Sequence, residues 1–163
     1  MLFDLGDVEA QRTILAAVEE KRRSGLRIGL TSGCFDLIHF QHVYYFFRCR
    51  RQCDVLIVGV DSDEMVRAEK GPSRPFIFDY KRAIMVDTLR PVSFTFVMNG
   101  LADLNTAARI FRPDFLFRNS DFAGREHEVV GREHAGEVVI VYDVEDHAST
   151  TDIARSIAAR IHT

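Results

Sequence analysis

The sequence predicts an α/β protein in which a parallel sheet of about five strands carries helices on both faces, within a single domain. Apolar segments typical of strands alternate with segments of helical periodicity along the chain, and this alternation favours a parallel sheet. The segment DVLIVGV, residues 54–60, is a continuous apolar run after its first residue, as expected for a strand covered on both faces. The length of 163 residues suits one domain with a sizeable core.

The individual elements follow from apolar periodicity and from residues that start or stop helices. The first helix is predicted over residues 7–24, where apolar residues recur at helical spacing before Gly25, a good stop signal. Residues 61–63 provide a cap for a helix that continues to about Lys70, and the glycine and prolines of residues 70–75 predict a loop. Strands are predicted at residues 27–32, 54–60, 92–98, 114–118 and 137–143, and further helices at 39–51, 78–89, 101–111 and 149–162.

No linker or low-complexity segment divides the chain. We therefore expect an N-terminal helix within residues 1–24 and one compact unit over residues 25–163. In open parallel sheets, ligands bind at the carboxyl ends of the strands. The crevice is expected to be formed by the loops 33–39, 61–63, 118–122 and 143–150.

Composition and charge narrow the classes of function. The net charge of −3 disfavours non-specific nucleic-acid binding, which needs a basic field. The basic clusters Lys21–Arg23 and Arg48–Arg51 are interpreted as solvated helix faces. The start of the chain lacks a signal-peptide pattern, and no apolar run is long enough to span a membrane. We therefore expect a cytoplasmic protein with neither a membrane nor a nucleic acid as its partner.

The three cysteines are interpreted as small buried hydrophobic residues. An odd count, Cys34, Cys49 and Cys53, disfavours a disulfide framework. Cys49 and Cys53 are spaced i,i+4 and lie near two histidines in the sequence, so a zinc site is conceivable. The spacing matches no familiar zinc pattern, and burial is the favoured interpretation.

The segment GCFDLIHFQHV, residues 33–43, has the features of an anion site. His39 and His42 lie at i,i+3 in the first turn of a predicted helix, where unpaired N–H groups and the helix dipole favour negative charge. Gly33 allows the backbone to approach a ligand closely, and Asp36 could cap the helix or orient a group. The alternative is a purely structural histidine pair.

Further groups that suit phosphate binding occur later in the chain. Residues 149–151, Ser-Thr-Thr, precede an amphipathic helix, and a plain N-cap needs only one hydroxyl. Lys70 and Arg74 lie on a Gly/Pro loop that could fold over a polyphosphate, and Arg82 follows in the next helix. Arg118 and Asp121 lie at another strand end. Taken singly, each of these charges could instead be a surface residue.

The order of these motifs resembles that of a known family. The pattern G-x-F-D-x-x-H-x-x-H, then K-G-x-S-R-P, then S-T-T-x-I, is similar to the cytidylyltransferase-like nucleotidyltransferases, over about Gly25 to Ile161. Within them it looks most like the adenylyltransferase domains that act on D-glycero-D-manno-heptose 1-phosphate, and next most like glycerol-3-phosphate cytidylyltransferase. The resemblance implies a Rossmann-like fold, and transfer of a nucleoside monophosphate from ATP or CTP to a sugar or polyol phosphate. It also implies a homodimer.

The resemblance also implies roles for residues. His39, His42 and Lys70 are the expected catalytic residues, and Mg²⁺ is expected on the triphosphate, held by substrate oxygens and water rather than by protein ligands. The expected nucleotide-binding residues are Ser32, Gly33, Cys34, Phe35, Gln41, Arg118, Asp121, Ser149, Thr150 and Thr151. The expected substrate-binding residues are Asp36, Asp63, Arg74 and Arg82.

This chain departs from the family pattern at three glycines. Gln41 replaces the glycine of H-x-G-H, and residues 118–121 read Arg-Asn-Ser-Asp in place of K-G-G-D. The charged and hydroxyl groups are kept, which favours an altered nucleotide or substrate preference. A nucleotide-binding module that has lost turnover is the main alternative. A metal-dependent hydrolase that uses the histidines is a weaker one, because the neighbouring carboxylates form no convincing ligand set.

The helix that follows the histidines is unusually rich in aromatic residues. Five aromatic side chains, Phe40, Tyr44, Tyr45, Phe46 and Phe47, lie within eight residues. They cannot all face one core. A subunit interface and burial beneath a neighbouring helix are both open as explanations.

Overall fold

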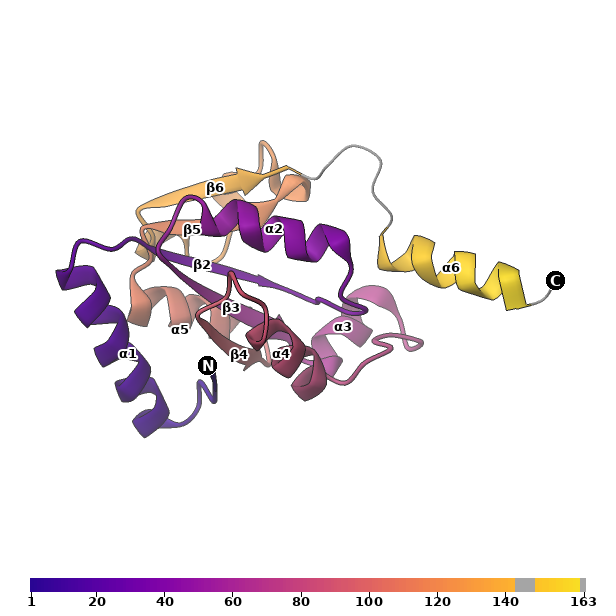
Figure 1. Ribbon diagram of the computed structural model, residues 1–163, viewed down its shortest axis with the longest axis horizontal. Helices are drawn as coiled ribbons and strands as arrows, with labels where there is room; N and C mark the ends of the chain where they lie inside the picture. Colours follow the sequence, from indigo (N-terminus) through magenta and orange to yellow (C-terminus); the bar gives the residue numbers. More distant parts are fainter. Residues whose placement is uncertain (143–148, 162–163) are drawn as a thin grey trace.

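The computed structural model describes residues 1–142 and 149–161 of the chain. One six-stranded sheet forms its centre, with helices on both faces (Figure 1). The pairs β1–β4, β4–β3, β3–β2, β2–β5 and β5–β6 are all parallel. The strands are β1 Leu2–Phe3, β2 Ile28–Gly33, β3 Val55–Asp61, β4 Phe94–Met98, β5 Phe115–Asn119 and β6 Glu137–Val141. The Rossmann-like α/β fold predicted from the sequence is therefore confirmed.

The positions of the helices and strands agree with those predicted from the sequence. The predicted helices and strands are present, and the ends that lie in the described residues differ from the predicted ends by at most two residues. The helices are α1 Val8–Arg23, α2 Phe40–Arg50, α3 Asp63–Lys70, α4 Asp79–Asp87, α5 Leu101–Phe111 and α6 Thr150–Ile161. Single 3-10 turns follow β5 at Ser120–Phe122, Glu126–Glu128 and Arg132–His134. The predicted contribution of residues 143–148 to the crevice falls outside the described residues.

The sheet has six strands, so the prediction of about five was one too low. The additional strand, β1, contains two residues, which pair with Thr95 and Phe96 of β4. Two residues are too few to show any periodicity in a sequence. The terminal amine holds this edge in place, because it donates a hydrogen bond to the Ser93 carbonyl at 2.7 Å and pairs with the Asp87 carboxylate at 2.6 Å.

Two apolar cores hold the helices against the two faces of the sheet. On one face, α1 and α5 pack with Ile28 and Ile57 of the sheet, and the α1 residue Val18 is fully buried. On the other face, α2 and α4 pack with Leu56 and Val58. Neighbouring residues of β3 thus face opposite cores, as the period of two along a strand requires.

The strand order reverses its direction at β2. The chain proceeds from β2 to β3 and β4 on one side, then crosses to β5 and β6 on the other. A crevice outside the carboxyl ends of β2 and β5 results at such a reversal. The fold therefore places Ser32, Gly33 and Arg118, which end these strands, at one location.

The aromatic residues of α2 divide between the core and the surface. Phe46 is fully buried, whereas Phe40 is 68% exposed and Phe47 is 44% exposed. Burial thus accounts for part of the aromatic run but not for all of it.

Cys49 and Cys53 lie in the apolar core beneath α2 and α4 and are free thiols, as predicted for small hydrophobic residues. No helix in the part of the chain that the structure describes is long and apolar enough to cross a membrane.

Helix α6 is the exception to this compact arrangement. Figure 1 shows it extending away from the sheet, with its N-terminal end nearest the body of the protein. Within α6 only Thr150 is buried, and residues 155–161 are all exposed.

Candidate active site

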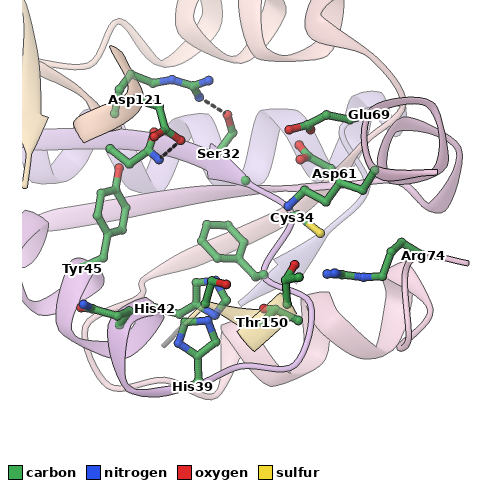
Figure 2. A pocket seen from close by; sticks show the side chains of 18 of the residues that line it. Ser32, Cys34, His39, His42, Tyr45, Asp61, Glu69, Arg74, Asp121 and Thr150 are labelled. Atoms are coloured by element: carbon green, nitrogen blue, oxygen red, sulfur yellow. Dashed lines mark hydrogen bonds between the residues drawn. The ribbon is translucent and has the colours of Figure 1, made fainter. Parts of the chain in front are cut away.

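A cavity of about 650 Å³ lies at the carboxyl ends of β2, β3 and β5 (Figure 2). It brings together groups that are far apart in the sequence: the loop after β2, the first turn of α2, the end of α3, the end of β5 and the first turn of α6. The predicted residues that line it are Ser32, Gly33, Cys34, Phe35, His39, Gln41, His42, Lys70, Arg74, Arg118, Asp121, Ser149, Thr150 and Thr151. Of the predicted residues, only Asp36, Asp63 and Arg82 are absent from its wall.

The two histidines lie side by side at the start of α2. His39 is the N-cap residue of the helix, and the ring centroids of His39 and His42 are 4.0 Å apart. Burial, together with the nearby His39 and Lys70, lowers the pKa of His42 to about 3. The imidazole of His42 is therefore neutral at ordinary pH. It can offer a hydrogen bond to a phosphate oxygen, but it adds no positive charge.

The loop between β2 and α2 has a strained backbone. Phe35 and Leu37 have φ values of 49° and 50°, in the left-handed region that residues other than glycine seldom adopt. Such conformations persist only where surrounding contacts hold them. Here the contacts are made by Asp36, between the two strained residues.

Asp36 is 1% exposed, and its carboxylate accepts three hydrogen bonds from residues 74–77. The donors are the Arg74 Nε at 2.8 Å, the Phe76 main-chain N–H at 2.9 Å and the Ile77 main-chain N–H at 3.1 Å. Its main-chain carbonyl accepts a 2.6 Å hydrogen bond from the Thr150 hydroxyl. Asp36 is thus fixed by protein donors and is absent from the cavity wall, and its contact with substrate stays a prediction.

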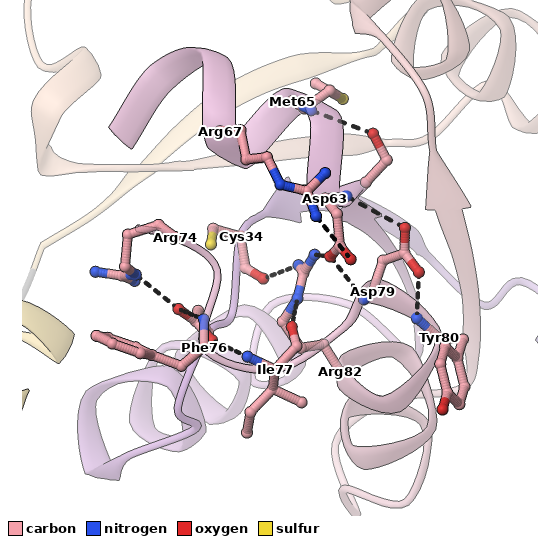
Figure 3. A network of polar contacts seen from close by, with 12 residues as sticks. Cys34, Asp63, Met65, Arg67, Arg74, Phe76, Ile77, Asp79, Tyr80 and Arg82 are labelled. Atoms are coloured by element: carbon pink, nitrogen blue, oxygen red, sulfur yellow. Dashed lines mark hydrogen bonds and ion pairs between the residues drawn. The ribbon is translucent and has the colours of Figure 1, made fainter. Parts of the chain in front are cut away.

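Buried Arg82 and half-buried Asp63 belong to a polar network that connects the loop after β2 with α3 and α4 (Figure 3). The Arg82 side chain is 0% exposed, and it donates to the Cys34 carbonyl at 2.5 Å, the Ile77 carbonyl at 2.8 Å and the Asp63 carboxylate at 2.9 Å. Asp63 and Asp79 each accept a hydrogen bond from the other's main-chain N–H. Both residues hold the loops that carry the cavity wall without lining the cavity themselves, and their substrate contacts stay a prediction.

The first turn of α6 presents hydroxyl and N–H groups to the cavity. The Ser149 hydroxyl and its main-chain N–H donate to the Asp152 carboxylate at 2.6 Å and 2.9 Å. The Asp152 main-chain N–H donates back to the Ser149 hydroxyl at 3.2 Å. Ser149 therefore caps the helix, as predicted, and Thr150 ties it to Asp36. The positive end of the helix dipole lies beside the cavity, where it favours an anion.

Cationic side chains border the opposite side of the cavity. Arg118 donates a 2.7 Å hydrogen bond to the Ser32 hydroxyl, and its guanidinium lies 4.3 Å from the centroid of the Phe122 ring. Its buried Nε has no hydrogen-bond partner among the described residues. Lys70 ends α3 and is exposed. No carboxylate of the described residues lies within 4.0 Å of its amine, so Lys70 is available to a ligand.

Five residues of the wall were not among the predicted site residues, although three of them lie in the loops 61–63 and 118–122 that were expected to form the crevice. Tyr45, Asp61, Glu69, Asn119 and Phe122 all line the cavity. Burial, and next the charge of Glu69, raises the pKa of Asp61 to about 6. The position of Asp61 at the end of β3, in the segment 61–63 that was expected to border the crevice, was the available signal. Ser62, within the segment 61–63 predicted to cap this helix, is the N-cap of α3 and accepts a hydrogen bond from the Met65 N–H at 3.3 Å.

The carboxylates of the wall can supply part of a metal shell. No group of three or more His, Cys, Asp or Glu side chains in residues 1–142 and 149–161 could hold a metal ion. Mg²⁺, however, is commonly held by one or two carboxylates together with substrate phosphates and water. Asp61 and Glu69 are oxygen ligands of this kind. The cavity therefore fits a magnesium ion that arrives with a polyphosphate.

Comparisons with known proteins agree with this geometry. Residues 30–156 match the profile of the cytidylyltransferase-like family. The bifunctional protein HldE of Hyphomonas neptunium is 35% identical over 147 residues, which are 88% of this chain and 30% of that protein. The HldE of Rhodopseudomonas palustris is 38% identical over 140 residues, 84% of this chain and 28% of that protein. The chain thus spans about 30% of the length of the curated relatives it matches.

Solved structures share the fold at low sequence identity. The lipopolysaccharide core biosynthesis protein from Thermoplasma volcanium has a TM-score of 0.62 at 18% identity, covering 74% of this chain and 100% of that chain. The pantoate-beta-alanine ligase from Francisella tularensis has a TM-score of 0.60 at 12% identity, covering 99% of this chain and 77% of that one.

The polar network around Arg82 predicts a large stability effect at this residue. We expect Arg82→Met to lower the free energy of unfolding by about 3–5 kcal/mol, because it leaves the half-buried Asp63 carboxylate and two carbonyls without their Arg82 donor. Arg67→Met is the matched control: Arg67 also approaches Asp63, at 3.8 Å, but its side chain is 47% exposed. We expect less than about 0.5 kcal/mol there. Urea unfolding of the three proteins measures both values, and equal effects would contradict the assignment.

The raised pKa of Asp61 predicts a pH-dependent loss of folding stability. Below about pH 4, Asp61 is protonated in both the folded and the unfolded protein. Between about pH 4 and pH 6, only the folded protein keeps this proton. The stability of the folded protein therefore falls as the pH rises through this range. We expect Asp61→Asn to stabilise the protein by about 1–2 kcal/mol at pH 8 and to have little effect at pH 4. Thermal unfolding at both pH values tests this, with the exposed Glu64→Gln as control. Stabilisation of equal size at both pH values would refute the explanation.

Proposed function

The chain belongs to the cytidylyltransferase-like family, and we propose that it is a nucleotidyltransferase. It transfers the nucleoside monophosphate of ATP or CTP to a phosphorylated sugar, such as a heptose phosphate, or to a phosphorylated polyol, and it releases pyrophosphate. One observation carries the proposal: a single cavity at the reversal of strand order joins His39 and His42 to the N-terminus of α6. These are two groups of phosphate-binding elements from opposite ends of the chain.

The proposed chemistry makes few demands on acid–base groups. A phosphate oxygen of the acceptor attacks the α-phosphorus of the triphosphate. The new O–P bond forms as the bond from the α-phosphorus to the bridging oxygen breaks, and pyrophosphate leaves with that oxygen. The attacking phosphate is already ionised, so no general base is needed. The protein has to align the reactants and stabilise charge on the phosphates.

The residues of the wall suit these tasks. We assign the triphosphate to the space between the histidine pair and the first turn of α6, because the imidazoles can donate hydrogen bonds and the positive end of the α6 dipole favours an anion. The Ser149 hydroxyl and N–H of this turn are bound to the Asp152 carboxylate. Lys70, at the end of α3, and Arg74, in the loop after it, approach the attacking phosphate. Arg118 and Asp121, at the end of β5, lie beside the nucleoside. Cys34 is buried at the edge of the cavity, and burial raises the pKa of its thiol, so it is a neutral wall group.

Two carboxylates and Arg82 act indirectly. Asp36, Asp63 and Arg82 are positioning residues, because they hold the loops that carry Cys34 and Arg74 and the start of α6. Mg²⁺, bound with the triphosphate, neutralises charge on the phosphate oxygens, and Asp61 and Glu69 would hold it together with substrate oxygens and water.

Gln41 distinguishes this cavity from the family pattern, which has a glycine at this position. It is 7% exposed and belongs to the cavity wall in the first turn of α2, between the two histidines. A glycine there would leave open space, whereas the amide can both donate and accept a hydrogen bond. We assign it to contact with the nucleotide in a site adapted to a different base or acceptor. The same bulk favours a second candidate, a module that binds a nucleotide without turning it over.

Pyrophosphate release tests the proposed reaction. We expect release with Mg²⁺ for one pairing of ATP, CTP, GTP or UTP with a panel of sugar and polyol phosphates. His39→Ala should lower the rate by a factor of about 100 or more, because it removes a donor that stabilises charge on the phosphates. His127→Ala is the matched control, since the His127 side chain is 71% exposed and lies outside the cavity. Nucleotide binding by calorimetry without any release would favour the binding module.

Substitution of Gln41 separates an adapted site from a blocked one. In an adapted site, both Gln41→Ala and Gln41→Gly should lower kcat/KM by about tenfold, the worth of one hydrogen bond to the substrate. Comparison of the two variants removes the cost of glycine in a helix, about 1 kcal/mol of stability. A rise in kcat/KM in both variants would contradict the assignment and indicate that Gln41 obstructs the site.

A further inference from the structure

Arg118 is a cation in the cavity wall that lacks a full set of hydrogen-bond acceptors. Its Nη1 donates to the Ser32 hydroxyl at 2.7 Å, whereas its buried Nε has no hydrogen-bond partner among the described residues. No carboxylate of residues 1–142 and 149–161 forms a salt bridge with it. Burial lowers the pKa of this guanidinium, because the charges nearby replace only part of its hydration. A ligand in the cavity can supply the acceptors that the protein does not.

Two contacts fix the plane of the guanidinium. The Ser32 hydroxyl holds Nη1, and the ring of Phe122 lies against the group, 4.3 Å from its Cζ to the ring centroid. The other edge, formed by Nε and Nη2, makes no hydrogen bond to a described residue. In Figure 2, Ser32 lies towards the end of the cavity that contains Asp121, away from His39. This is the end to which the nucleoside is assigned.

The free edge of the guanidinium is a planar pair of N–H donors, and it matches a base that presents two neighbouring acceptors. Cytosine presents O2 and N3 side by side, and guanine presents O6 and N7. Adenine places its amino donor next to N1 and N7, and uracil has an N–H between its two carbonyl oxygens. A bidentate contact with Arg118 therefore selects cytosine or guanine.

The α2 side chains near Arg118 favour the smaller of these two bases. Gln41 and Tyr45 lie at i,i+4 on α2 and therefore on one side of the helix, and both line the cavity. The Tyr45 hydroxyl shares a 2.7 Å hydrogen bond with the hydroxyl of Thr31, the residue before Ser32. These two side chains take up room beside the nucleoside, which favours a pyrimidine.

We propose that Arg118 selects the base of the nucleotide and that the donor is CTP rather than ATP. The inference rests on the proposed function, which names both donors. Arg118 donates to O2 and N3 of cytosine through Nε and Nη2, while Ser32 and Phe122 hold the plane of the guanidinium. It is a specificity-determining residue, since it contacts the base and takes no part in the transfer. A lysine would offer a point charge in place of this planar pair of donors.

Calorimetry with CTP, UTP, ATP and GTP, each with Mg²⁺, tests the selection in the native protein and in Arg118→Lys. CTP and UTP are of equal size, so the ratio of their dissociation constants isolates the acceptor at N3. We expect the native protein to bind CTP at least about tenfold more tightly than UTP or ATP. Arg118→Lys should narrow both ratios to less than about threefold.

Two further variants control this experiment. Arg125→Lys is the matched control: its guanidinium also lies near the Phe122 ring, at 5.9 Å, but its side chain is 58% exposed and outside the cavity wall. We expect it to keep the native ratios. Ser32→Ala keeps the guanidinium and removes the hydroxyl that orients it, so the ratios should narrow here too, which decides the matter if Arg118→Lys does not fold.

The outcomes separate the inference from the proposed function. Equal affinity for the four nucleotides, tighter binding of ATP or GTP than of CTP, or a preference for CTP that survives Arg118→Lys would each overturn base selection by Arg118 and leave nucleotide binding standing. Absence of binding by all four nucleotides would refute the proposed function, and the inference with it.

Discussion

Asp36, a buried residue, connects the segments that surround the cavity through its carboxylate and its main-chain carbonyl. It holds the strained loop after β2 in place, fixes residues 74–77 through three hydrogen bonds, and through its main-chain carbonyl anchors Thr150. These segments are separated by up to 114 positions in the chain. A buried carboxylate with three donors is costly to leave unsatisfied, so the three segments keep their relative positions. The histidine pair, the Arg74 loop and the start of α6 can therefore face one ligand.

The electrostatics of the cavity follow from this arrangement. His42 is neutral, so affinity for phosphates has to come from hydrogen-bond donors, from the N-terminal end of α6 and from the nearby lysine and arginine side chains. Asp61 and Glu69 add negative charge on the same wall. Burial, and next the charge of Glu69, raises the pKa of Asp61, so keeping this carboxylate ionised costs stability. Charge kept at a cost inside a cavity is typical of a site that meets a cation or a hydroxyl-rich ligand.

The sequence was sufficient for the fold and for much of the cavity, because both rest on local patterns. Apolar alternation located the helices and strands, and short motifs located the histidines and the hydroxyl run of residues 149–151. It was insufficient where burial decides the role of a charge. Arg82 and Asp63 looked like ligand contacts, but tertiary packing places them outside the cavity wall. The place of Asp61 in the cavity wall also depends on tertiary packing, and β1 is too short to leave any periodic signal.

The most direct test of this account is a crystal structure with Mg²⁺ and a triphosphate whose α,β-bridging oxygen is replaced by a methylene group. The account predicts that the phosphates lie between the imidazoles of His39 and His42 and the first turn of α6, with the nucleoside towards Arg118 and Asp121. Phosphates bound elsewhere, or a Gln41 side chain that fills the space and keeps the nucleotide out of the cavity, would contradict it.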